Sequence, residues 1–266
     1  MAPMKRFLQA VSRYATYLAW LTSSSYSFRN GWYITRRKAK IALENVDDFL
    51  TTYDIYANGH YDRLGNNAQP GSVVWDIGAN ISVASLIFAQ NPNVSHVYAY
   101  EPVPHTFACA VRSLSANPEL ATKITLENLG IGSSERDIQV NYTKKAKAAI
   151  GIADIPPRLK ALYRIKPQDM QTITIRLADA AQVLRTIRSR HPGAPILLKL
   201  DAEGAEYEII DRLVETGDIR EINAAAIEWH LLPGEDHITS KLRTADFQTQ
   251  AKILDPGCIG MIDAWR

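Results

Sequence analysis

The sequence lacks the features that mark several special classes of protein. Of its 266 residues only two are cysteines, Cys109 and Cys258, which are too few for a secreted disulfide framework and too far apart for a zinc knuckle. It has no run of about 18 uncharged apolar residues, so we expect no transmembrane helix. It also shows no internal repeat and no biased composition. With 46% hydrophobic residues, the chain can bury one large core.

Charge is unevenly distributed, although the net charge is only +2. Residues 1–43 contain eight basic residues and no acid, and residues 144–168 contain seven basic residues against Asp154. The rest of the chain is acidic. We expect the two basic segments to bind an anionic partner. The alternative is that they are solvated surface, or that they form ion pairs with acidic residues elsewhere in the chain.

The first residues have the pattern of an amphipathic helix. Its apolar face consists of Phe7, Val11, Tyr14, Leu18 and Leu21. Such a helix can make a peripheral contact with an anionic membrane, pack on its own domain, or form a homodimer with a second subunit.

We expect the protein to be cytoplasmic. A signal peptide fits poorly, because Gln9, Ser12 and Arg13 interrupt the apolar core that one requires. Of the three glycosylation sequons, the one at Asn80 lies within a predicted functional site, where a glycan would destroy that site. We therefore interpret all three as accidental.

From residue 71 onward, short apolar strands alternate with helices. Strands are predicted at 72–77, 95–101, 123–129, 195–201 and 222–229, with further candidates at 137–143 and 171–176. Helices are predicted at 82–90, 105–116, 179–190, 203–216 and 237–249. Residues 251–255 and 258–263 are predicted to close the fold as an antiparallel hairpin. This order predicts an α/β fold, in which helices cover both faces of a mostly parallel sheet.

The chain divides into an N-terminal extension, residues 1–70, and a main domain, residues 71–266. We expect the extension to be helical to about residue 50 and irregular after it. Residues 144–170 interrupt the sheet pattern with three prolines and many basic residues, so we expect an inserted lid there.

Polar residues follow four of the predicted strands. The groups are Asp76-Ile77-Gly78-Ala79-Asn80, Glu101-Pro102, Asp201-Ala202-Glu203 and Glu228-Trp229-His230. In open α/β sheets, ligands bind beyond the carboxyl ends of the strands. The sequence therefore predicts one binding site that contains these residues.

The first two groups have the spacing of a site for an adenosine ribose. Gly78 allows a sharp turn and close approach of a ligand, and Glu101 follows Asp76 by 25 residues, near the spacing of an acid that binds a ribose diol. A nicotinamide dinucleotide is disfavoured, because two of the three glycines of its motif are missing. The carboxylates favour a cationic ligand instead, such as S-adenosylmethionine.

Here the sequence resembles the FkbM family of S-adenosylmethionine-dependent methyltransferases. The resemblance rests on VVWDIGANIS, VYAYEP, LLKLDAEGAEYEII and AIEWH, and covers roughly residues 70–230. It implies a seven-stranded methyltransferase fold with an antiparallel final hairpin, and methyl transfer to a hydroxyl of a small molecule or sugar. It also implies a cofactor site made of Asp76, Gly78, Ala79, Asn80, Glu101, Pro102 and Asp201, with Glu203 nearby. One departure is Ser82, where the family usually has glycine.

Methyl transfer to an alcohol needs alignment of the reactants and a base for the proton. The candidate catalytic residues are Asp201, Glu203, Glu228 and His230, of which His230 has the most suitable pKa. Asp201, Glu228 and His230 could converge on a divalent metal, but nothing in their spacing requires one, so we expect none. The other histidines, His60, His96, His105, His191 and His237, are interpreted as surface residues.

The expected acceptor is a small molecule or glycan, anionic if the basic residues of the lid face inward. Two alternatives remain. One is a nucleic-acid methyltransferase acting on RNA ribose, which the lack of interleaved basic and aromatic residues disfavours. The other is a non-catalytic binding module that keeps the cofactor fold.

Overall fold

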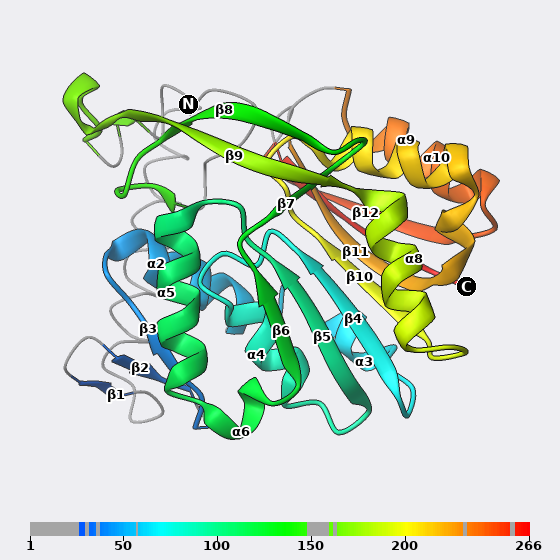
Figure 1. The fold of residues 1–266 in the computed structure, drawn as a ribbon, viewed down its shortest axis with the longest axis horizontal. Helices are drawn as coiled ribbons and strands as arrows, with labels where there is room; N and C mark the ends of the chain where they lie inside the picture. The colour runs from blue at the N-terminus through cyan, green and yellow to red at the C-terminus, as the bar shows by residue number, and fades with distance from the viewer. Residues whose placement is uncertain are drawn as a thin grey trace, which may run out of the picture.

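The computed structural model describes residues 27–29, 32–35, 38–56, 58–147, 160–161, 164–230, 233–255 and 259–266. Its centre is a seven-stranded sheet (Figure 1). The strand order is β12 (Gln248–Asp255), β13 (Ile259–Trp265), β11 (Ile222–His230), β10 (Ile196–Leu200), β4 (Ser72–Ile77), β5 (Val94–Tyr100) and β6 (Ile124–Glu127). β6, β5, β4, β10 and β11 are parallel neighbours, whereas β13 pairs antiparallel with both β11 and β12. The predicted fold class is confirmed.

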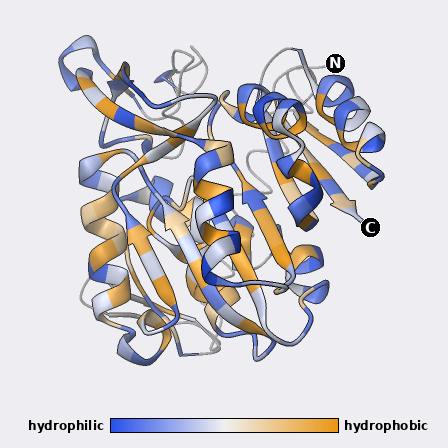
Figure 2. Cartoon of the chain, turned by 45° about the vertical axis from the view of Figure 1, so that its right-hand side comes forward, coloured by the Kyte–Doolittle hydropathy of each residue, from blue (hydrophilic) through white to orange (hydrophobic). Residues whose placement is uncertain are grey.

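Helices cover both faces of this sheet because its strands are apolar on both sides. In β4, Val73 and Trp75 belong to one hydrophobic cluster and Val74, between them, belongs to another. The first cluster includes residues of α8 (Ala180–Arg190), α9 (Glu206–Thr216) and α10 (Glu235–Thr244). The second includes residues of α3 (Asp62–Asn66) and α4 (Val83–Ala89). Figure 2 shows the hydrophobic residues concentrated on the central strands.

A third apolar cluster joins the N-terminal part of the described chain to the sheet domain. It brings Ile41 and Phe49 against Leu86 of α4 and Cys109 of α5 (Pro104–Ser115). Short helices complete the connections: α6 (Pro118–Ala121) and the 3-10 helices η2 (Pro167–Asp169) and η3 (Asp218–Glu221).

The two further strand candidates form a separate three-stranded sheet. It consists of β7 (Gly130–Gly132), β9 (Gln171–Asp179) and β8 (Arg136–Tyr142), in that order, and β8 and β9 cross the top of Figure 1. The proposed lid is the connection between β8 and β9. Residues 148–159 and 162–163, about half of its length, lie outside the described residues, so the lid stays a prediction.

The expectation of a helical N-terminal extension is wrong for residues 27–42. They contain β1 (Ser27–Arg29), β2 (Trp32–Ile34) and β3 (Lys40–Ala42), an antiparallel sheet. Aromatic and β-branched residues in this stretch favour strands over helix. The segment after residue 50 is not irregular either, because α2 spans Val46–Tyr56 and α3 follows it.

The amphipathic helix predicted for residues 7–21 lies outside the described residues. Among the helices of the described segments, none has the length and apolar character needed to cross a lipid bilayer.

Candidate active site

A cavity of about 1100 Å³ opens at the carboxyl ends of the parallel strands. Its wall includes Gly78, Ala79, Asn80, Glu101, Pro102, Asp201, Glu203 and Glu228. Apolar residues of β8 and β9, among them Val140 and Leu177, form another part of the wall. This volume lies slightly above the range of about 300–1,000 Å³ that is usual for small-molecule sites, so the cavity has room for two ligands.

The turn after β4 requires glycine at position 78. Gly78 has a φ of 74°, and a Cβ there would lie 1.7 Å from the carbonyl oxygen of Asp201. The backbone N–H groups of Gly78 and Ala79 both donate to the carbonyl of Tyr100. Asn80 also has a positive φ, 49°, and its Oδ1 is buried without a hydrogen-bond partner among the described residues. The turn therefore offers an unused acceptor beside the cavity.

Glu101 is held at the cavity wall by the backbone. Its carboxylate accepts hydrogen bonds from the N–H of Asn80 at 3.0 Å and of Val103 at 2.9 Å, and the residue is 6% exposed. Burial raises the pKa of Glu101 to about 7, although these N–H groups act in the opposite direction. Because an ionised carboxylate has about four acceptor positions, Glu101 can accept two more hydrogen bonds from a ligand.

Lys199 is a buried cation beneath this site. Its Nζ lies 3.3 Å from Asp76 Oδ1 and 3.6 Å from Asp201 Oδ2, and it donates to the carbonyl of Ile77. Burial favours the neutral amine, but the charges of Asp76 and Asp201 outweigh it and raise the pKa of Lys199. Asp76 also accepts a hydrogen bond from Ser85. Lys199 thus joins the ends of β4 and β10.

His230 lies among carboxylates at the ends of β10 and β11. Its Nδ1 is 3.0 Å from Glu206 Oε1, and its Nε2 is 3.6 Å from Glu203 and 3.8 Å from Glu228. Burial disfavours the charged ring, but Glu203 and Glu206 raise the pKa of His230 well above its ordinary value. Burial and the neighbouring carboxylates Asp201, Glu228 and Glu206 raise the pKa of Glu203, against the opposite effect of His230. The cluster therefore concentrates negative charge at the cavity wall.

His60 and Tyr61 come from the segment between α2 and α3 and also line the cavity. His60 Nε2 lies 3.2 Å from Glu228 Oε2, and Tyr61 donates a hydrogen bond to Asp201 at 3.3 Å. Burial lowers the pKa of His60, but Glu228 outweighs it, so the net shift is upward. The wall thus contains a histidine–glutamate pair.

The family model of the methyltransferase FkbM domain matches residues 76–249, more than half of the chain. This chain belongs to the FkbM methyltransferase family. It is an S-adenosylmethionine-dependent methyltransferase, and the resemblance seen in the sequence is confirmed.

Two relatives illustrate the range of FkbM methyltransferases. The hexuronic acid methyltransferase AglP of Haloferax volcanii is 24% identical over 213 residues, which cover 80% of this chain and 79% of AglP. The 31-O-demethyl-FK506 methyltransferase FkbM of Streptomyces tacrolimicus is 26% identical over 214 residues, which cover 74% of this chain and 80% of the relative.

The fold of this FkbM methyltransferase brings most of the predicted site residues to one cavity, and two of them lie outside its lining. Asp76 is fully buried and does not line the cavity; it supports the site through Lys199 and Ser85. His230 is also absent from the described lining, because its ring is packed behind Glu203 and Glu228. Ser82, the departure from the family, has a φ of 65°, a conformation that suits the usual glycine.

Sequence reasoning misses four residues of the site. His60 is interpreted there as a surface histidine, and Tyr61 lies in the same segment, which has no regular pattern. Lys199 carries a usable signal, because it is a charge inside an apolar strand and such a residue is buried only with partners. Glu206 accepts from the N–H groups of Ala202 and Gly204, and so fixes the turn after β10.

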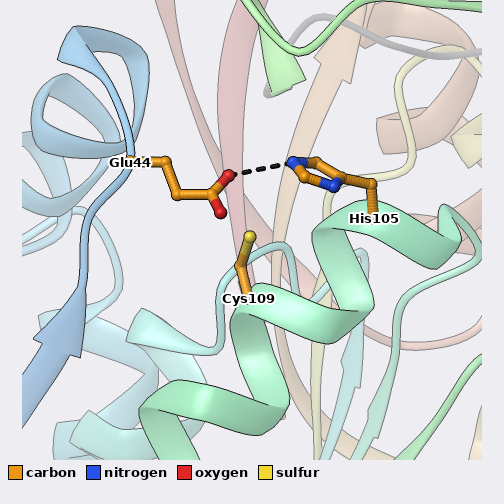
Figure 3. Close-up of side chains that lie close together, drawn as sticks. All are labelled: Glu44, His105 and Cys109. Atoms are coloured by element: carbon orange, nitrogen blue, oxygen red, sulfur yellow. Dashed lines mark hydrogen bonds and ion pairs between the residues drawn. The ribbon is translucent and has the colours of Figure 1, made fainter.

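A second cluster lies between the segment after β3 and helix α5. Glu44, His105 and Cys109 are close enough for a metal site, and Figure 3 shows the hydrogen bond between Glu44 and His105. Lys147 Nζ lies 3.0 Å from Glu44 Oε2 and 3.6 Å from Cys109 Sγ, and Arg112 also pairs with Glu44. Because these two cations neutralise Glu44, the arrangement disfavours a metal ion and instead fixes Lys147 against α5 and the segment after β3.

Proposed function

We propose that this methyltransferase transfers a methyl group to a hydroxyl oxygen of a sugar or another small molecule. The relatives support this acceptor class, since their names specify a hexuronic acid and 31-O-demethyl-FK506. The observation that carries the proposal is the pair of His60 and Glu228 in the wall of the cavity that also contains Glu101. This pair can remove a proton from an alcohol beside the methyl donor.

The donor side of the cavity fits S-adenosylmethionine. The Glu101 carboxylate has free acceptor positions for two ribose hydroxyls, and the buried Asn80 Oδ1 needs a donor. Gly78 lets the backbone of this turn pack against the carbonyl of Asp201, so that the two strand ends meet at the cavity. When bound, S-adenosylmethionine supplies a methyl group on a sulfur that leaves as a neutral thioether.

On the acceptor side, the hydrogen bond to Glu228 fixes the orientation of His60. Because Nε2 donates to the carboxylate, Nδ1 is the ring nitrogen that can accept a proton. The acceptor O–H bond breaks and its proton goes to Nδ1, while the oxygen forms a bond to the methyl carbon. Glu228 then stabilises the imidazolium that results.

An anionic acceptor stays a prediction. Of the basic segment 144–168, Lys147 is the described residue that lines the cavity, and Glu44 and Asp48 neutralise it. A cytoplasmic location, a membrane contact through the N-terminal helix and a homodimer also stay predictions.

The test is a methylation assay with three acceptor classes: glycosides of uronic and neutral hexoses, primary amines, and RNA oligonucleotides. Formation of S-adenosylhomocysteine is followed together with the mass and linkage of the product. We expect turnover with a glycoside and a methyl ether as product. Turnover confined to amines or RNA would contradict the proposal.

A first prediction concerns the ribose contact. We expect Glu101→Gln to weaken S-adenosylhomocysteine binding by about 1–3 kcal/mol, the range of a hydrogen bond to a charged group. Since the pKa of Glu101 is about 7, its carboxylate is ionised above that pH and protonated below it. The wild-type affinity should therefore fall as the pH drops below about 7. Isothermal titration calorimetry at several pH values measures both effects.

The matched control is Glu119→Gln, which changes an exposed carboxylate on α6, outside the cavity lining. It should bind S-adenosylhomocysteine like the wild type and keep the pH dependence. Equal affinity of Glu101→Gln and the wild type would rule out the ribose assignment.

A further inference from the structure

Arg63 of α3 is held in one position at the wall of the cavity. Its guanidinium carbon lies over the indole of Trp265, 4.0 Å from the ring centroid, and Nη1 donates a hydrogen bond to Gln250. Nε and Nη2 have no hydrogen-bond partner within the described ranges of the chain. Because the side chain lines the cavity and is 41% exposed, these two donors are accessible to a ligand.

Asp263 is an acidic neighbour of Arg63, but it does not occupy these donors. Its Oδ2 lies 3.7 Å from Nη1 of Arg63, which is an ion pair beyond hydrogen-bonding distance. Burial raises the pKa of Asp263, and the opposing charges of Arg63 and His60 do not outweigh that effect. Arg63 therefore keeps both charge and N–H donors for an anion.

Lys252 provides a second positive charge on β12. It follows Gln250 by two residues, so both side chains lie on the same face of the strand, the face that Arg63 contacts. Lys252 is exposed and lines the cavity. Lys147 and Lys199 also line it, but both are paired with carboxylates, whereas Lys252 forms no ion pair with any residue that the structure describes.

We propose that Arg63 and Lys252 bind an oxyanion of the acceptor, a carboxylate or a phosphate, and that the enzyme therefore prefers an anionic sugar. The planar guanidinium matches the geometry of either group, and the lysine adds a point charge. This inference rests on the proposed function, because it names the class of acceptor for the same methyl transfer.

The strand register places these two cations near the proposed base. Lys252 pairs with Met261 of β13, and Met261 pairs with Glu228 of β11. Two strand spacings, about 10 Å between the backbones, thus separate Lys252 from Glu228, which is hydrogen-bonded to His60. An acceptor that is anchored by its anionic group can therefore present a nearby hydroxyl to His60.

The charges of the cavity wall also differ between its two sides. Glu101 and Asp201 follow β5 and β10, where the cationic donor is proposed to bind. Arg63 and Lys252 belong to α3 and β12, and β12 is separated from β10 by both β11 and β13. Each substrate is thus expected to contact charges opposite to its own, which favours binding in the correct orientation.

The test compares kcat/KM for matched forms of one hexose: the neutral methyl glycoside, the methyl glycoside of its uronic acid and the methyl glycoside 6-phosphate. Glucose, galactose and mannose series are used. We expect the wild type to prefer a charged form over the neutral form at least about tenfold, the effect of a hydrogen bond to a charged group. The charged form that is preferred distinguishes a carboxylate from a phosphate. Added salt should reduce the preference.

Arg63→Gln and Lys252→Gln should each reduce this preference, because KM for the charged form rises about tenfold. Calorimetry with S-adenosylhomocysteine verifies that each variant still folds and binds the donor product. The matched control is Arg266→Gln. Arg266 also lies over an aromatic ring, 4.1 Å from the centroid of Phe247, but it does not line the cavity, so the wild-type preference should remain.

Equal kcat/KM for the neutral and charged forms in the wild type would overturn this inference whether or not the variants fold. The proposed function would stand in that case, because a hydroxyl is still methylated. A preference that persists in both variants would also overturn the assignment of Arg63 and Lys252. If no glycoside of any series gives a methyl ether, the proposed function fails, and this inference fails with it.

Discussion

Replacing Lys199 by methionine is expected to lower the free energy of unfolding by about 3–5 kcal/mol, the usual effect of removing one partner of a buried ion pair. The Lys199 side chain is 2% exposed and lies between Asp76 and Asp201. Its loss leaves Asp76 buried with only the hydroxyl of Ser85 as a side-chain partner among the described residues. Urea denaturation followed by circular dichroism measures the change.

Lys241→Met is the matched control, since Lys241 is 37% exposed and pairs with Asp211 at the surface. It should change the free energy of unfolding by no more than about 0.5 kcal/mol. A loss of less than about 1 kcal/mol for Lys199→Met would contradict the view that Lys199 joins the ends of β4 and β10.

The largest effect on catalysis is expected for His60→Gln, which should lower kcat about 10²- to 10⁴-fold. Glutamine can still donate a hydrogen bond to Glu228 but cannot accept the acceptor's proton. Because His60 lies outside the proposed donor contacts, the affinity for S-adenosylhomocysteine should stay unchanged. Steady-state kinetics with a saturating acceptor, together with calorimetry, separates the two quantities.

The matched control is His105→Gln, the same substitution at another histidine. His105 is also hydrogen-bonded to a glutamate, Glu44, but it does not line the cavity. Its kcat should remain near that of the wild type. If His60→Gln keeps full kcat, the proton must go to another group, and the assignment of His60 as the base is wrong.

The sheet and the donor side of the site can be predicted from the sequence because their signals are local. A buried strand such as 72–77 is an unbroken apolar run, and its predicted bounds are those of β4. Gly78 and Glu101 follow their strands directly, so the parallel sheet places both at the same edge. The carboxylates that follow the strands can be assigned to one site for the same reason.

The acceptor side cannot be predicted in this way, because it depends on tertiary contacts. His60 reaches Glu228 from a segment 168 residues earlier in the chain, and nothing in that segment marks it. His230 has the expected strand-end position, but the buried Glu206 turns its ring behind the cavity wall. In the N-terminal extension, β1, β2 and β3 pair with one another in place of the expected helix. Strands of three residues are too short for an alternating pattern to reveal them in the sequence.

The central claim is that the carboxylates at the strand ends surround one cavity, which binds S-adenosylmethionine with its methyl group facing the acceptor. A crystal structure of the complex with S-adenosylhomocysteine tests it most directly. We predict both ribose hydroxyls within hydrogen-bonding distance of Glu101 and the sulfur facing His60 and Asp201. A ligand whose ribose contacts other residues, or whose sulfur faces away from β10 and β11, would contradict the account.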